Sequence, residues 1–380
     1  MAKYKLEDIF DLQMGKTPSR NNLEYWNTCE NKWISIGDLS QAGKYIVDTK
    51  EYLSDLAVEE SGIKMIPANT VVMSFKLSIG KTAITSEDMY SNEAIMAFHD
   101  KNVVEIMPEY IYYMFKYKSW DEGTNKAVMG KTLNKATLSK VEIEISPIEK
   151  QKEIVEVLDK ISAILDKRNE ELLKLDDFLK ARFVEMFGDP VTNPYSWSIV
   201  EFDDCLESIE NGKSFVCDSG ARVDDRPAIL KLSAVTYGIY KPEENKAIIN
   251  EKDFIGSAEV HADDLLFTRK NTPELVGTAA YVESTPGKLM MPDLIFRLNT
   301  KNNCNKIFLW KLINHDSYRS QIKSVANGSA KSMSNISKER LRKLRFPMPP
   351  IELQNQFADF VRVIDKSKLP KSTQEGGIAC

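Results

Sequence analysis

The two halves of this chain repeat one another, and this repeat constrains the fold more than any other feature. Residues 138–151 end in Pro147-Ile-Glu-Lys-Gln151, and residues 341–354 end in Pro350-Ile-Glu-Leu-Gln354. The offset is 203 at both positions, since 350 − 147 and 354 − 151 agree. A constant offset across a strand-like segment, a proline and a helix start predicts a duplicated architecture. We therefore expect two similar domains with two similar tasks.

Composition indicates an ordinary soluble globular protein with room for two hydrophobic cores. Of the 380 residues, 42% are hydrophobic and 28% are charged, and this length exceeds that of one typical domain. No segment approaches the roughly 20 uninterrupted apolar residues of a membrane span, and the N-terminus shows no basic and apolar leader. We expect a cytoplasmic protein without a membrane partner.

Cysteine usage and charge exclude further classes of function. The five cysteines are scattered without a Cys-x-x-Cys pair, so neither a zinc site nor a disulfide framework is expected. The net charge of −5 argues against nucleic-acid binding by bulk charge alone. Local basic surface is still available, because residues 331–345 carry six Lys or Arg and one acid, Glu339. A solvated helix face is the alternative interpretation of that run.

Each half is predicted to be a mixed α+β domain, the first over residues 1–147 and the second over residues 189–349. Alternating apolar residues at 33–36 and 141–145 predict strands in the first half, and residues 108–118 predict a helix. Residues 68–76 match residues 262–270 at an offset of 194, and residues 93–98 match 292–298 more loosely. The offset differs from 203, so we expect common frames with loops of different length.

A long helix joins the halves, over residues 148–188. Ile148 to Phe187 contain no proline or glycine, and their apolar residues recur at a 4-3 spacing, which predicts a coiled-coil-forming helix about 60 Å long. Residues 350–369 begin a second helix in the same register, but Lys368 stands where the first helix has Leu165 (368 − 203). Pro370 and a polar tail, 370–380, then end it, so this second helix is truncated. The residues expected to pair the helices are Ile154, Leu158, Ile161, Leu165, Leu172, Leu175, Leu179, Phe357, Val361 and Ile364.

The sequence shows no constellation of catalytic residues. Three Gly-Lys-Thr tripeptides, at residues 15–17, 80–82 and 130–132, lack the further glycine of a phosphate-binding P-loop. They suit turns that donate hydrogen bonds to DNA phosphates, or else they are ordinary strand turns. The three histidines are isolated from one another, so metal and triad chemistry have no candidate ligands. We predict no active site, no metal and no resident cofactor.

Together these features resemble the DNA-specificity (S) subunit of type I restriction-modification systems. The resemblance rests on the two similar halves and on the Pro-Ile-Glu-x-Gln start of each long helix. It also rests on Phe183-Val-Glu-Met-Phe-Gly-Asp-Pro190, which precedes an aromatic re-entry at Tyr195-Ser-Trp197. It covers the chain up to about Leu369.

The resemblance implies a non-catalytic reader of DNA. Each half would be a target-recognition domain that binds one part of a bipartite double-stranded target, and the paired helices would fix the separation of the two. Two methyltransferase (M) subunits would dock on the chain and methylate adenine with S-adenosylmethionine, which would therefore bind in the partner. Restriction (R) subunits would complete the enzyme.

Candidate DNA contacts follow from loop position and side-chain chemistry, because base readout depends on a few loop side chains. For any one of them, simple surface solvation is an equal alternative. In the first half they are Lys16, Thr17, Ser19, Arg20, Lys76, Lys81 and Lys131, and in the second half Lys213, Ser214, Arg269, Lys270, Asn271, Lys331 and Ser332.

The truncated second helix departs from the family pattern and leaves alternatives open. It would remove the partner of the first helix between Arg168 and Met186 and affect the second methyltransferase dock. The chain would then be a truncated or phase-variant subunit that binds the methyltransferase without directing productive methylation. Alternatively, exposed leucines of the long helix would pair with a second copy of the chain.

Overall fold

The computed structural model describes residues 2–76, 78–120, 133–327 and 333–368. It divides into two compact units, residues 1–168 (unit 1) and 169–380 (unit 2). The division falls inside the long helix, so each unit carries one end of it.

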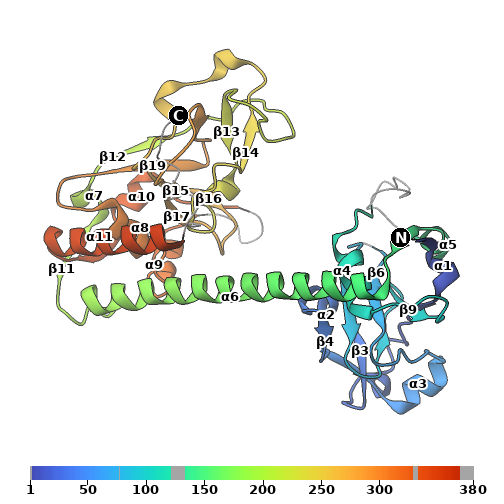
Figure 1. Cartoon of the computed structure of the whole chain (residues 1–380). Coiled ribbons are helices and arrows are strands. Elements are labelled where there is room, and N and C mark those ends of the chain that lie inside the picture. The colour runs from blue at the N-terminus through green and yellow to red at the C-terminus, as the bar shows by residue number, and fades with distance from the viewer. Residues whose placement is uncertain (1, 77, 121–132, 328–332, 369–380) are drawn as a thin grey trace. The chain divides into compact units, whose positions relative to one another are not determined.

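Unit 1 is a mixed α+β structure (Figure 1). Its main sheet has the order β2-β9-β6-β7-β4, a second sheet has the order β5-β3-β8, and β1 pairs with β10. The strands are β1 (Ala2–Lys5), β2 (Phe10–Met14), β3 (Asn31–Ile34), β4 (Tyr45–Ile46), β5 (Glu51–Leu53), β6 (Val71–Ser74), β7 (Thr82–Thr85), β8 (Tyr90–Ser91), β9 (Ile95–Asp100) and β10 (Glu142–Ile145). The helices are α1 (Leu6–Ile9), η1 (Leu23–Tyr25), α2 (Ile36–Gln41), α3 (Asp55–Ser61), α4 (Pro108–Tyr117), α5 (Lys135–Ser139) and the start of α6 (Ile148–Phe187).

Unit 2 repeats this plan with different loops. Its sheets have the orders β12-β19-β15-β17, β14-β13-β18, β11-β21 and β16-β20. The strands are β11 (Ser198–Glu201), β12 (Leu206–Asn211), β13 (Ala228–Leu230), β14 (Asn245–Ala247), β15 (Leu265–Thr268), β16 (Lys270–Asn271), β17 (Ala279–Tyr281), β18 (Leu289–Met290), β19 (Ile295–Thr300), β20 (Ser334–Asn335) and β21 (Arg345–Met348). The helices are α7 (Phe202–Cys205), η2 (Leu232–Ala234), η3 (Glu251–Asp253), η4 (Gly256–Ala258), α8 (Lys306–Ile313), α9 (Arg319–Ser324), α10 (Lys338–Arg342) and α11 (Ile351–Lys368).

The sheets confirm the predicted duplication. In each unit the first strand pairs antiparallel with the last, as β1 with β10 and β11 with β21. The order β2-β9-β6-β7 in unit 1 has its equivalent in β12-β19-β15-β17 of unit 2. The predicted helix over residues 108–118 is α4, which packs beside β6 and β7, and α8 lies beside β17 in the same way. The two halves are therefore mixed α+β structures built on one frame.

The glutamine of the repeated Pro-Ile-Glu-x-Gln motif fastens each long helix to its unit. Gln151 is fully buried, accepts a hydrogen bond from the Met107 amide at 2.9 Å and donates to the carbonyls of Ser146 and Glu105. Gln354 is also fully buried. It accepts from the Asn305 amide at 2.9 Å and donates to the Pro349 carbonyl at 2.8 Å. A buried backbone group needs a partner, so the side chain is fixed by the groups that it satisfies.

The apolar stripe of α6 is buried only toward its two ends. Ile154 and Leu158 pack against the core of unit 1, and Leu179 lies in the core of unit 2. Between them Ile161 and Leu165 are 47% and 56% exposed, while Leu172 and Leu175 are half-buried. A continuous coiled-coil seam is thus still a prediction, whereas the long central helix itself is confirmed.

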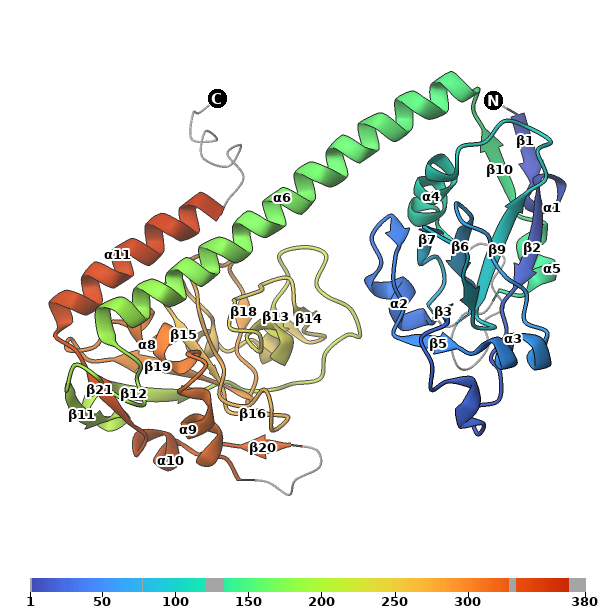
Figure 2. The ribbon, with the colours of Figure 1, turned by 90° about the horizontal axis from the view of Figure 1, so that it is seen from below.

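Helix α11 packs against the C-terminal part of α6, as both views show (Figures 1 and 2). Phe357 and Val361 are buried in the same core as Leu179, Phe183 and Phe187, and Ile364 packs at its edge. The Phe357 ring lies 5.3 Å from the Phe187 ring, and Lys368 Nζ lies 2.7 Å from an Asp176 carboxylate oxygen. The helices are therefore antiparallel. The expectation that truncation leaves residues 168–186 without a partner is wrong for Asp176 to Met186.

Candidate nucleic-acid interface

Three loops of unit 1 meet at the C-terminal ends of β2 and β6 and the N-terminal end of β9. We call the place where they meet the junction of unit 1. The Gly15 amide donates to the Ile95 carbonyl, and the Lys16 amide donates to the Ser91 carbonyl at 2.8 Å. The Phe75 amide donates to the Ala94 carbonyl at 3.0 Å. A Cβ at Gly15 would lie 2.2 Å from the Asn92 oxygen, so only glycine permits this approach. The loops are thereby fixed by their backbones.

Unit 2 has an equivalent junction with the same three backbone hydrogen bonds between its loops. The Gly212 amide donates to Ile295, the Lys213 amide to Met291 at 3.0 Å, and the Arg269 amide to Leu294 at 3.0 Å. A Cβ at Gly212 would lie 2.2 Å from the Pro292 oxygen. Because the flanking sequences differ, the shared hydrogen bonds show that the two junctions are structurally equivalent.

Four side chains occupy equivalent positions on each junction. We define the first loop cluster as Lys16, Thr17, Lys76 and Glu93, and the second loop cluster as Lys213, Ser214, Lys270 and Asp293. The Thr17 hydroxyl donates to the Glu93 carboxylate, and the Ser214 hydroxyl donates to the Asp293 carboxylate. The Asp293 amide also donates to Ser214 Oγ at 3.2 Å. A lysine, a hydroxyl, a second lysine and an acid thus recur together.

The first cluster carries an ionised acid among cations. The hydrogen bond from Thr17 lowers the pKa of Glu93, and the positive charges of Lys76 and Arg20 lower it further, although desolvation of the carboxyl group opposes this. The ammonium of Lys76 lies 5.1 Å from the centre of the Phe75 ring, and Lys213 lies 5.1 Å from the Phe215 ring. Lys16 and Lys213 are exposed, while Lys76 and Lys270 are half-buried. Lys16 Nζ donates to the Ser61 carbonyl.

Arg20 and Ser19 belong to a neighbouring aromatic site of unit 1. The Arg20 guanidinium carbon lies 3.7 Å from the Trp26 ring centre, and the guanidinium donates to Glu51 with Nη2 at 3.1 Å. The Ser19 carbonyl accepts from the Trp26 indole at 3.0 Å. A guanidinium that is both stacked and paired is already satisfied within the fold.

The other predicted contacts have varied surroundings. Lys81 donates to the Ser40 hydroxyl. The Arg269 guanidinium donates to Asn335 Oδ1 at 3.2 Å. Asn271 is only 6% exposed and donates to Thr236 Oγ1 at 3.0 Å, so its side chain has a structural role in unit 2. Three predicted residues, Lys131, Lys331 and Ser332, lie outside the described residues.

Sequence reasoning missed the acids Glu93 and Asp293 as members of the candidate site. Each pairs with a hydroxyl more than 75 residues away, 76 for Glu93 and 79 for Asp293, so no local motif signals the contact. The signal that existed was the loose match between residues 93–98 and 292–298, because it aligns these two acids.

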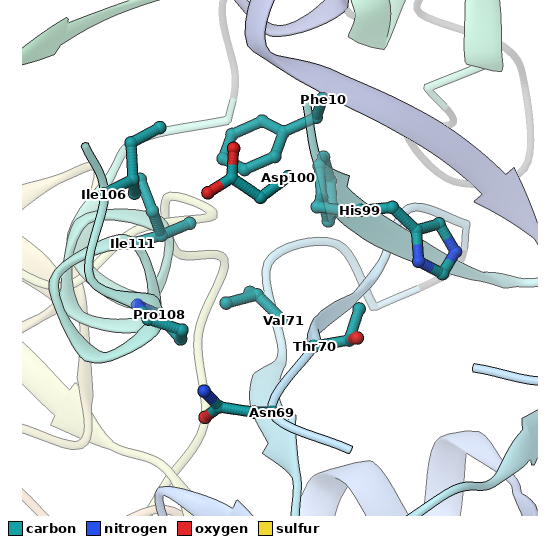
Figure 3. Close-up of a pocket in the computed structure, with 10 residues that line it drawn as sticks. Phe10, Asn69, Thr70, Val71, His99, Asp100, Ile106, Pro108 and Ile111 are labelled. Atoms are coloured by element: carbon teal, nitrogen blue, oxygen red, sulfur yellow. The ribbon is translucent and has the colours of Figure 1, made fainter. Parts of the chain in front are cut away.

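A separate cavity of about 230 Å³ lies in unit 1 (Figure 3). Its lining includes Phe10 and Val71, at the opposite ends of their strands from the first loop cluster. The Asp100 side chain points into the cavity, whereas the His99 ring points away from it and lies 3.1 Å from Gln13 Oε1. The polar residues of the lining are Asn69, Thr70, His99 and Asp100, and the others are apolar.

Neither a metal cluster nor a membrane span is found in the part of the chain that the structure describes. No group of three or more His, Cys, Asp or Glu side chains there could hold a metal ion. No helix within the described ranges is long and apolar enough to cross a bilayer.

Comparisons with known proteins agree with this duplicated frame. The family model of the type I restriction modification DNA specificity domain matches residues 1–174 and 196–375. The Escherichia coli type I restriction enzyme EcoEI specificity subunit is 29% identical over 193 residues, 49% of this chain and 32% of that protein. The MjaIX specificity subunit of Methanocaldococcus jannaschii is 28% identical over 270 residues, 66% of this chain and 60% of that protein. The aligned stretches thus span less than two thirds of these relatives.

Solved structures show the same fold over nearly the whole chain. A type I restriction-modification S subunit from M. genitalium superposes with a TM-score of 0.52 at 12% identity, over 97% of this chain and 90% of that one. A chain from a structure of type I restriction-modification complex assembly and conformational transition gives 0.50 at 14% identity, over 97% and 93%. With two matched domains that together cover most of its length, this chain belongs to the family of type I restriction-modification DNA specificity subunits, which are not themselves the catalysts.

Proposed function

We propose that this chain is the sequence-reading subunit of a type I restriction-modification enzyme, and that each unit binds one part of a bipartite DNA target. The observation that carries the proposal is the pair of loop clusters. Two equivalent sets of lysines and hydroxyls, on backbones fixed by the same hydrogen bonds, suit the positioning of DNA phosphates at two separate places. Loops that differ around these shared sets suit two different half-sites.

The long helix would act as the spacer between the two readers. Its 40 residues correspond to about 60 Å at a rise of about 1.5 Å per residue, roughly the length of 17 base pairs. Methyltransferase subunits, two in number, would dock on the helices and methylate adenine with S-adenosylmethionine. Restriction subunits would add cleavage. The packing of α11 on α6 supports an assembled rather than a disabled subunit, because the short helix still buries Phe357 and Val361.

The DNA-contacting residues of this proposal are mainly those of the two loop clusters. Arg20, Lys81 and Arg269 are retained as secondary candidates, and Asn271 is removed because it is buried. Each lysine that neutralises one phosphate releases condensed counterions, so log K falls with log salt by about 0.9 per contact. Two lysines lost from one cluster should therefore reduce that slope by about 2.

The test uses the chain in complex with its methyltransferase subunit and a double-stranded probe. The double variant Lys213→Ala/Lys270→Ala should weaken binding and reduce the salt slope by about 2. The control, Lys246→Ala/Lys252→Ala, removes the same charge from two exposed lysines elsewhere in unit 2. Equal effects of the two double variants would show that only net charge matters and would remove the second loop cluster from the interface.

A complex that co-purifies with the methyltransferase but modifies no DNA would favour the alternative of a truncated, phase-variant subunit. Self-association through the exposed part of α6, including Ile161 and Leu165, would instead appear as concentration-dependent dimerisation in analytical ultracentrifugation.

A further inference from the structure

The two loop clusters contain an acid where the proposed function would favour only cations. Glu93 and Asp293 stand beside lysines that we propose to bind phosphates, and an ionised carboxylate repels phosphate. Yet both units carry an acid at the equivalent place, held by the equivalent hydroxyl. Because both loop clusters contain an acid that opposes phosphate binding, we expect the acid to have a function other than phosphate binding.

A purely structural role explains the acids poorly. The three loops of each junction are already joined by backbone hydrogen bonds that do not involve these side chains. Glu93 is exposed and Asp293 is half-buried, so neither carboxylate fills a core position. Among the described residues, the ion pairs with a nitrogen-to-oxygen distance within 4.0 Å include neither Glu93 nor Asp293.

The hydroxyl orients each carboxylate and leaves it able to accept more hydrogen bonds. An ionised carboxylate has about four acceptor sites on its two oxygens, and one hydrogen bond from Thr17 or Ser214 occupies one of them. Restraining the side chain in this way reduces the conformational entropy that a further contact would cost. A carboxylate oriented in this way suits a further donor, such as one on DNA.

In the major groove the donors are the exocyclic amines, N4 of cytosine and N6 of adenine, whereas guanine and thymine present acceptors there. At adenine the neighbouring N7 is itself an acceptor and repels a carboxylate, so cytosine is the base that suits an acid. We propose that Glu93 and Asp293 are specificity-determining residues, each of which accepts a hydrogen bond from the N4 amine of one cytosine in its own half-site. This inference rests on the proposed function. The lysines of each cluster position the backbone, and the acid reads one base.

The test measures which sequences the complex with its methyltransferase subunit modifies in a library with randomised half-sites. Glu93→Gln keeps the length of the side chain and can still accept from Thr17, but it replaces one carboxylate oxygen with a donor. We expect one position of one half-site to lose its preference for C by about 5- to 150-fold, while the other half-site is unchanged. Asp293→Asn should do the same in the other half-site.

Thr17→Val is the matched control for a structural role, because it removes the orienting hydroxyl and keeps the acid. It should lower the rate of modification while the preferred base stays the same. If Glu93→Gln and Asp293→Asn lower modification of all sequences equally and leave the base preference intact, the acids only brace the loops and the inference is overturned.

The failure of this inference is distinguishable from the failure of the proposed function. An unaltered complex that modifies a split sequence, together with acid variants of identical preference, overturns the inference alone. An unaltered complex that modifies no split sequence overturns both.

Discussion

Replacing Gln354 should expose how each long helix is fastened to its unit. Gln354→Ala removes the acceptor of the Asn305 amide and the donor to the Pro349 and Asn303 carbonyls. Each such bond contributes about 1 kcal/mol, and a buried amide left without a partner costs about 1 to 3 kcal/mol. The higher helix propensity of alanine returns only a few tenths of a kcal/mol. We expect a loss of about 3 kcal/mol from the free energy of unfolding of unit 2.

The same helix supplies a matched control. Gln356→Ala makes the same substitution at an exposed position, and should change stability by no more than about 0.5 kcal/mol. Since about 1 kcal/mol corresponds to about 2 to 4 °C in a unit of this size, calorimetry should show a fall of about 6 to 12 °C for Gln354→Ala. Hydrogen exchange of peptides covering residues 303–313 should accelerate with it. If the two variants melted within 1 °C of each other, the fastening role of the motif would be refuted.

Two further predictions concern a glycine and a half-buried lysine. Gly15→Ala should lower the stability of unit 1 in a urea titration by about 1 to 3 kcal/mol, because the added Cβ overlaps a backbone carbonyl. Gly43→Ala is the control and should have little effect, because a Cβ there meets no atom within 4 Å. Burial lowers the pKa of Lys311 to about 8, so between pH 8 and 10.5 the unfolded chain binds a proton that the folded chain lacks, and stability rises with pH across that window. Lys311→Met should therefore be more stable than the unaltered chain at pH 7, by at most about 3 kcal/mol. The loss of the contact between Lys311 and the Trp310 ring reduces this gain. Urea midpoints of the two chains that differ equally at pH 7 and pH 10 would contradict this prediction.

Features that repeat in the sequence were predictable from it. The Pro-Ile-Glu-x-Gln motif predicted both helix starts, because the same motif forms the same hydrogen bonds in each half. Gln151 and Gln354 each accept a hydrogen bond from a backbone amide. The glycine-lysine-hydroxyl turns at Lys16 and Lys213 were also found, since a glycine is required where two backbones come within contact.

Features that depend on distant residues were not predictable. Whether Arg20 is available to DNA depends on Trp26 and on Glu51, which is 31 residues away. We predicted Asn271 to be a loop residue that contacts DNA. In the structure it lies in β16, which pairs with β20, and its buried side chain donates a hydrogen bond to Thr236. The stripe of α6 was visible as a 4-3 spacing, yet spacing alone could not show that Ile161 and Leu165 lie beyond the core that covers Ile154.

Single-molecule sequencing of DNA from a methylation-free host that expresses this chain with its neighbouring methyltransferase subunit would show whether the two units read one split target. We expect modified adenines within a split motif, two short specific parts separated by a fixed gap. We also expect that Lys16→Ala/Lys76→Ala and Lys213→Ala/Lys270→Ala reduce modification of that motif. An undivided motif, or no modified motif with both proteins soluble and associated, would contradict the claim that the two units are paired readers of one target.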